Sequence, residues 1–200
     1  MAADHNLSYV LVHFPYLWDS GGRNVGLHRL RDSVARIKWL EGEYGVKVVC
    51  EPKLGPRKDP SAFVLLWSIS QQELSQWDLS LCLDVGDIYL ACRSLRGKWE
   101  QVFSHLAPWC DVVHLHNVWT GGTRHYWTPV SRNGNVPIKD MLSILKSMNR
   151  DIYAVLEYTP HRTGSHLEVA KGIDWLLQNS CPWKGRDGHN TWNGKYIQVR

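Results

Sequence analysis

The sequence lacks any apolar run that approaches the roughly 20 residues of a membrane-spanning helix. Residues 1–5 also lack the basic-then-apolar pattern of a secretory signal peptide. The five cysteines are odd in number and form no Cys-x-x-Cys pair, so a disulfide framework is not favoured. We therefore expect buried, reduced thiols in a cytoplasmic protein.

The chain also has no block of charge of one sign and no nucleotide-binding motif. Its formal charge is +4, and its Lys and Arg residues are scattered among acidic ones, so charge gives no reason to expect nucleic acid or membrane partners. Neither a Gly-x-Gly-x-x-Gly fingerprint nor a phosphate loop occurs, which leaves nucleotide cofactors without support. Of the 200 residues, 44% are hydrophobic and 21% are charged. This composition indicates one globular domain over residues 1–200.

Short apolar runs alternate with segments of helical periodicity along most of the chain. The runs at residues 9–14, 46–50, 79–83, 111–115 and 152–156 are typical of strands. Helical spacing of apolar residues predicts helices near residues 27–45, 61–67, 71–76, 95–106, 138–145 and 166–177. Residues 118–136 are expected to form a long loop, and the tail at 180–200 has no predicted structure. This order predicts right-handed βαβ crossovers and hence a parallel sheet.

The predicted strand at residues 111–117 carries two imidazoles at its end. Because strand side chains alternate between faces, His114 and His116 point the same way and Val113 and Leu115 point the other. An apolar run that turns polar only at its carboxyl end is typical of a parallel strand that leads into an active site.

Other predicted strands end in the same kind of residue. Five strand ends carry a metal ligand or an acid/base group: His13, Glu51, Asp84, His114 and Glu157. If the strands lie side by side in a barrel, these ends meet at one mouth. Carboxylate oxygens with one imidazole suit a divalent ion such as Mn²⁺, Mg²⁺, Co²⁺ or Zn²⁺, and the lack of a thiolate among them argues against a structural zinc site.

Six short motifs, taken together, resemble the xylose isomerase-like TIM barrels. This superfamily holds sugar phosphate isomerases and epimerases and the type IV apurinic endonucleases. The motifs lie at residues 10–15, 48–52, 82–84, 112–117, 133–136 and 155–158, and the resemblance extends over residues 9–177. It implies an α/β fold of the (β/α) TIM-barrel type.

The isomerase and epimerase branch of this superfamily implies a site with one divalent metal ion. By motif matching the metal ligands would be Glu51, Asp84, His114 and Glu157, with His116 as the alternative imidazole. Glu51 and Glu157 would also be the catalytic pair, moving a proton to and from a sugar or sugar phosphate through an enediolate. The candidate substrate contacts are His13, Asp87, His116, Arg124, His125 and Trp127.

The endonuclease branch implies a zinc phosphodiesterase, and here the chain departs from the pattern. Asp87 stands where that branch has a histidine ligand, and Thr123 stands where it has a carboxylate before Arg124 and His125. An endonuclease is therefore the alternative hypothesis. A catalytically silent or truncated barrel is a third.

Matching also leaves the first two βα units of the eight-stranded barrel without a counterpart. The expected fold is thus a partial barrel, whose two open sheet edges need covering. Three candidates could close the gap: the first ten residues, the tail at 180–200, and a second subunit in a homo-oligomer.

Overall fold

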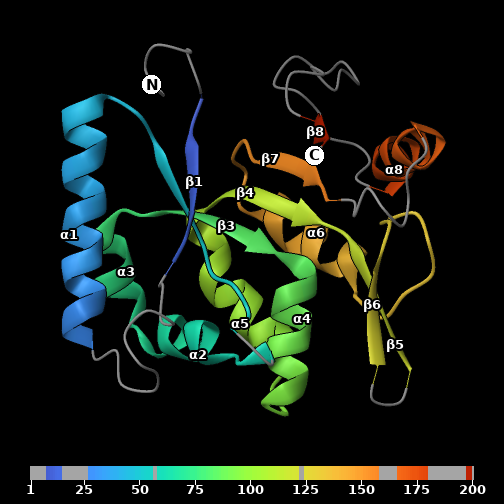
Figure 1. The fold of residues 1–200 in the computed structure, drawn as a ribbon, viewed down its shortest axis with the longest axis horizontal. Coiled ribbons are helices and arrows are strands. Elements are labelled where there is room, and N and C mark those ends of the chain that lie inside the picture. Colours follow the sequence, from blue (N-terminus) through green and yellow to red (C-terminus); the bar gives the residue numbers. More distant parts are fainter. Residues whose placement is uncertain are drawn as a thin grey trace.

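The computed structural model of the chain describes residues 8–14, 27–55, 58–121, 124–157, 166–179 and 197–199. At its centre is a sheet of six parallel strands (Figure 1). The strands are β1 (Val10–His13), β2 (Val48–Glu51), β3 (Ser80–Asp84), β4 (Cys110–Leu115), β7 (Tyr153–Leu156) and β8 (Ile197–Val199). They pair in the order β1-β2-β3-β4-β7-β8, so each strand lies beside the next parallel strand along the chain, as in a barrel.

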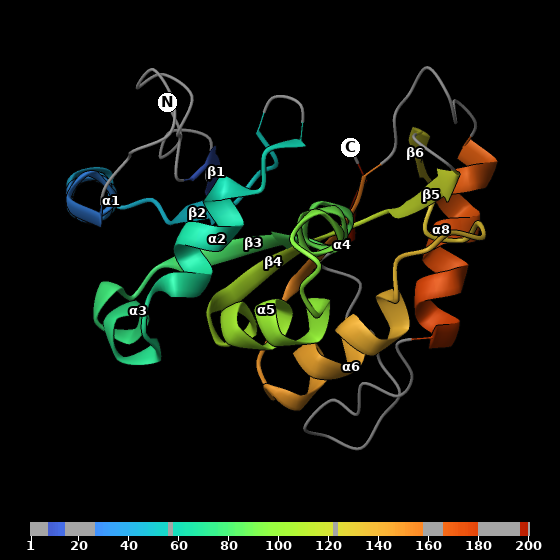
Figure 2. The ribbon, with the colours of Figure 1, turned by 90° about the horizontal axis from the view of Figure 1, so that it is seen from below.

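Helices separate the parallel strands. They are α1 (Leu27–Tyr44), α2 (Ser61–Ser68), α3 (Gln71–Trp77), α4 (Val85–Ser94), α5 (Trp99–Leu106), α6 (Ile138–Ser147) and α8 (His166–Asn179), with the short 3-10 helix η3 (Ala107–Trp109) before β4. Figures 1 and 2 show α2, α4, α5 and α6 on one side of the sheet. In a TIM barrel the helices likewise form a layer on the outer side of the sheet.

The two faces of the sheet pack into different hydrophobic clusters. On the helix-covered face, Cys50, Leu83 and Leu115 belong to the large core. Their neighbours in sequence point to the opposite face, where a small apolar cluster contains Val49, Cys82, Val112 and Val155. In a barrel this second face is the interior, which is normally filled with side chains.

Helix α1 illustrates how the pattern of the sequence becomes local structure. Leu30, Val34 and Ile37 recur at helical spacing and are buried, while the residues between them are mostly exposed. The helix ends before Gly45, whose φ of +61° favours glycine and whose amide donates to the Glu41 carbonyl at 2.9 Å.

The expected fold class, a partial TIM-barrel type of parallel α/β sheet, is confirmed. The five predicted strands and most predicted helices are present within a few residues of their expected bounds. The tail at residues 180–200 lies outside the described residues, except for β8, which extends the sheet beside β7.

The helix predicted near residues 95–106 is present but begins later, and the helix that precedes it was not predicted. The structure has α4 at Val85–Ser94 and starts α5 only at Trp99, with Arg96 between them at a φ of +52°. Most of α4 is buried, including Val85, Ile88 and Ala91, so it lacks the polar face that a helical periodicity search requires.

The prediction of an irregular loop over residues 118–136 is also wrong in part. It contains an antiparallel hairpin of β5 (Asn117–Gly121) and β6 (Arg124–Thr128). A signal for it was present in the sequence, since β-branched and aromatic residues flank Gly121 and Gly122 on both sides.

Among the described residues, no helix is both long and apolar enough to cross a membrane.

Candidate metal and substrate site

Sheet register brings the polar strand ends together. His13 is paired with Glu51 across β1 and β2, and Asp84 with His114 across β3 and β4. Partners in a parallel ladder point to the same face. The polar residues therefore lie at the carboxyl ends of the strands, above the small apolar cluster of the inner face.

His114 stands between two carboxylates. Its side chain is buried, and Nδ1 lies 3.2 Å from Glu51 Oε1 and 3.1 Å from Glu157 Oε1. Despite these short distances, Nδ1 makes no hydrogen bond of acceptable geometry. Burial lowers the pKa of His114, but Glu157 and Glu51 outweigh burial and raise it to about 9.

Asp84 and His116 form a second buried pair, with 2.8 Å between Asp84 Oδ1 and His116 Nε2. The same carboxylate caps α4 by accepting from the Asp87 amide at 2.9 Å. Burial alone would raise the pKa of Asp84, but His116, Lys53 and this amide hold it well below its usual range. Asp84 is thus a buried carboxylate that stays ionised.

Lys53 also enters the site. Its Nζ lies 2.9 Å from Glu51 Oε1 and 3.6 Å from Asp84 Oδ2. Burial lowers the pKa of this lysine, but Asp84 and Glu51 outweigh burial and raise it. Sequence analysis missed Lys53, although it follows Glu51 by two residues and alternation would place both on one face.

Asp87, predicted to contact substrate, is buried beneath the segment that follows β2. Its Oδ2 accepts from the Leu54 amide at 3.2 Å. Burial and the neighbouring Asp84 raise the pKa of Asp87 to about 7. In this geometry Asp87 fixes the backbone next to Lys53.

Two of the other predicted substrate contacts, His13 and Trp127, are partly exposed beside the site. His13 Nε2 is 3.6 Å from Glu51 Oε2, and the His13 side chain is 45% exposed. The hairpin places Trp127 against His116, with ring centroids 4.5 Å apart and nearly perpendicular rings. The structure describes the backbone of Arg124 and His125 as part of β6, but their side chains lie outside the described residues.

The donor atoms at this mouth suit a divalent cation. Two groups have ligand atoms within 4.8 Å of one another: Glu51 with Cys82 and His114, and Asp84 with His116 and Glu157. The four ligands predicted from the sequence are thus divided between the two groups, with Glu51 and His114 in one and Asp84 and Glu157 in the other. The contact between His114 and Glu157 connects the groups. The buried Nδ1 of His114, facing two carboxylates without a hydrogen bond, is the observation that fits a cation best.

Cys82 is a donor that sequence analysis did not include. It is fully buried, and burial together with Glu51 raises the pKa of its thiol well above the usual value. Cys82 therefore stays a neutral thiol unless a metal ion binds its sulfur and displaces the proton to solvent.

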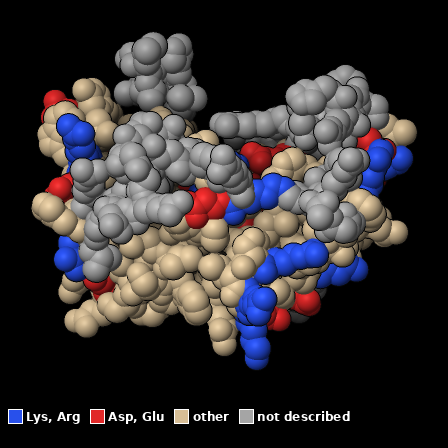
Figure 3. All heavy atoms as spheres, turned by 60° about the horizontal axis from the view of Figure 1, so that its bottom comes forward, with Lys and Arg blue, Asp and Glu red and all other residues tan. Residues whose placement is uncertain are grey.

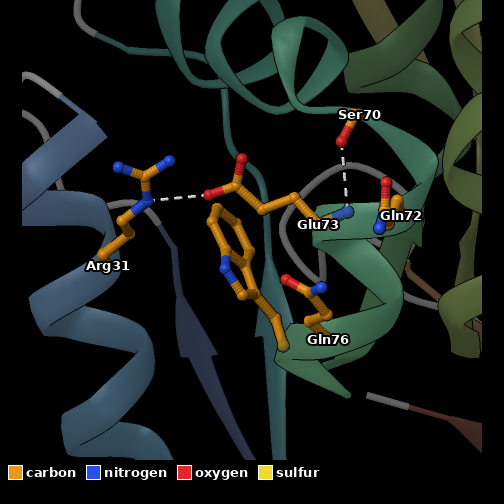
Figure 4. Close-up of a pocket in the computed structure, with 6 residues that line it drawn as sticks. Arg31, Ser70, Gln72, Glu73 and Gln76 are labelled. Atoms are coloured by element: carbon orange, nitrogen blue, oxygen red, sulfur yellow. Dashed lines mark hydrogen bonds and ion pairs between the residues drawn. The ribbon is translucent and has the colours of Figure 1, made fainter.

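A polar hollow elsewhere on the molecule is unrelated to this site. It lies between α1 and α3 and is lined by Ser70, Gln72, Gln76 and the ion pair of Arg31 with Glu73, whose atoms are 2.7 Å apart (Figure 4). Because α3 leads into the amino end of β3, the hollow is not at the carboxyl ends of the strands.

Fold and site together define an α/β barrel-type protein with an acid- and imidazole-lined mouth. The family model for xylose isomerase-like TIM barrels matches residues 1–179, and the chain belongs to this family. The family includes isomerases and epimerases as well as relatives of the type IV endonucleases. No curated protein matches the chain in sequence.

Solved structures with the same fold are distant in sequence. A xylose isomerase domain-containing protein from Salmonella typhimurium LT2 is 18% identical with a TM-score of 0.65, over 90% of this chain and 65% of its own. The IolI protein, solved with a zinc atom, is 13% identical with a TM-score of 0.61 over the same shares. A xylose isomerase domain protein from Planctomyces limnophilus is 13% identical with a TM-score of 0.59, over 88% of this chain and 61% of its own. The chain thus spans a little under two thirds of each.

Replacing Gly86 with alanine should disturb the pair of Asp84 and His116. A Cβ at position 86 would lie 2.1 Å from His116 Cε1, so the ring must move. We expect a loss of roughly 1–3 kcal/mol in the free energy of unfolding, measured by urea denaturation. The matched control is Gly42→Ala, where a Cβ meets nothing within 4 Å. Equal stability of the two variants would contradict the packing described.

The metal-free protein should lose stability as pH rises through the range in which His114 loses its proton. The pKa of His114 is raised from 6.5 to about 9. Its charge therefore stabilises the fold fully below pH 6.5, and this contribution disappears as pH approaches 9. Urea denaturation of chelator-treated protein should show the decline, and His114→Gln should flatten it. A wild-type slope retained in His114→Gln would rule out this origin.

Proposed function

We propose that the protein is a divalent-metal-dependent isomerase or epimerase of a sugar or sugar phosphate. The observation that carries this proposal is the position of His114 between Glu51 and Glu157, all at the carboxyl ends of parallel strands. Two carboxylates on either side of one donor can bind a cation and still reach a substrate carbon from different directions.

Glu51, Asp84, His114 and Glu157 would hold the metal ion, with His116 and Cys82 as nearby donors. A bound cation of this kind polarises a carbonyl group and acidifies the neighbouring carbon-bound proton. The zinc atom in the IolI structure is consistent with a metal at this mouth, although that protein shares only 13% identity. Mn²⁺, Co²⁺, Mg²⁺ and Zn²⁺ all suit oxygen and imidazole donors.

Glu51 and Glu157 would transfer the proton. Burial raises the pKa of Glu157, but His114 outweighs burial and lowers it, so this carboxylate is ionised and able to accept a proton at neutral pH. Return of the proton to the opposite face of the enediolate gives an epimer, and return to the adjacent carbon gives an isomer. Trp127 and His13 would contact the sugar from the rim.

A zinc phosphodiesterase is the second candidate, because the donors form two groups instead of one. Other observations favour it less. Asp87 stands at the position of a histidine ligand in the endonuclease branch, and its carboxylate accepts a hydrogen bond from the Leu54 amide. On the face that Figure 3 draws, basic and acidic side chains of the described residues are interspersed, whereas a DNA-binding face is usually basic.

Loss of either glutamate should strongly reduce sugar conversion. Glu51→Gln and Glu157→Gln should each lower kcat/KM about 10²- to 10⁴-fold on a panel of ketoses and their phosphates supplied with Mn²⁺ or Co²⁺. Exchange of the substrate carbon-bound proton with deuterated solvent should fall in parallel. Glu100→Gln, on the exposed side of α5, is the control.

The proposal fails if both site variants retain full activity. It also fails if the wild-type protein nicks abasic duplex DNA with bound zinc and converts no sugar. That second result would establish the phosphodiesterase.

A further inference from the structure

The ammonium group of Lys53 occupies the region between two strand-end carboxylates. It lies 2.9 Å from Glu51 Oε1 and 3.6 Å from Asp84 Oδ2. Both carboxylates are almost fully buried, with 1% of Glu51 and 1% of Asp84 exposed. Buried carboxylates require a positive partner, and Lys53 supplies one to both.

The backbone around Lys53 is fixed from both sides. Pro52 restricts φ immediately before it, and the Leu54 amide donates to buried Asp87 immediately after it. The side chain is 26% exposed, so its four-carbon stem can also reach solvent. Lys53 can therefore move its ammonium group out of the site without unfolding the segment that carries it.

We propose that Lys53 is an internal counter-cation that competes with the divalent metal ion for Glu51 and Asp84. The inference rests on the metal dependence of the proposed function. With Lys53 inside, the metal-free site is neutralised and stays folded. When a metal ion binds, the ammonium must leave both carboxylates, because two cations that share the same carboxylates repel each other.

This competition makes Lys53 a determinant of metal affinity. For an ion of low charge density, the binding free energy with Glu51 and Asp84 is too small to displace the ammonium group. For a well-coordinated divalent ion, the binding free energy is large enough. Lys53 therefore weakens the binding of every divalent ion and keeps the site intact without one.

The test compares metal binding by wild type, Lys53→Met and Lys53→Arg. Methionine keeps the length of the stem and removes the charge, whereas arginine keeps the charge. The control is Lys139→Met, an exposed lysine on α6 that changes net charge by the same amount. Binding is measured by calorimetric titration with Zn²⁺ and by the electron spin resonance signal of Mn²⁺, and the stability of each metal-free form by urea denaturation.

Lys53→Met should bind both ions about tenfold or more tightly than wild type, because a competing charge is gone. The same variant should be less stable than wild type without metal, since two buried carboxylates each lose one of their positive partners. Lys53→Arg and Lys139→Met should bind metal with affinities close to wild type.

Unchanged or weaker metal binding by Lys53→Met would overturn the proposal. Absence of metal binding in both wild type and Lys53→Met would overturn it as well, since nothing would then compete with the lysine. Turnover of sugars is a separate readout. Tighter metal binding by Lys53→Met in a protein that converts no sugar would support the competition while contradicting the isomerase.

Discussion

The candidate site depends on one constraint, the alternation of side chains along strands of a parallel sheet. Register places successive strand ends at one edge, and alternation decides that Glu51, Asp84 and His114 point to the inner face instead of to the helices. A shift of one residue along the strands would put the apolar side chains of Cys50, Leu83 and Val113 in the places of these groups. The packing of the helix-covered face therefore also fixes the geometry of the polar mouth.

That mouth buries several charged groups, and each is compensated. Asp84 is paired with His116 and caps α4, and Glu51 lies near both His114 and Lys53. Removing one partner from such a set leaves a buried charge without compensation, which costs more than the pair contributes. The arrangement has the character of a cation site whose positive charge comes partly from the chain itself. In the proposed function, the same residues would serve metal binding and proton transfer as well as folding.

Much of the architecture could be predicted from the sequence, because short apolar runs that end in His, Glu or Asp recur in order along the chain and alternate with helical segments. Three features escaped prediction for physical reasons. Helix α4 is too buried to show an amphipathic face, and the hairpin of β5 and β6 lies in a segment whose Gly residues resemble a loop. The proximity of Lys53 to Asp84 depends on register between two strands and on a hydrogen bond from Leu54 to Asp87, neither of which a single sequence specifies.

The central claim is that the strand ends converge on one cation site, and metal content tests it most directly. Elemental analysis of the purified protein after incubation with divalent metals and gel filtration should find about one equivalent per chain. Asp84→Asn should lose it while remaining folded, because asparagine still caps α4. A folded wild-type chain that retains no metal, or an Asp84→Asn variant that retains as much as wild type, would contradict the account.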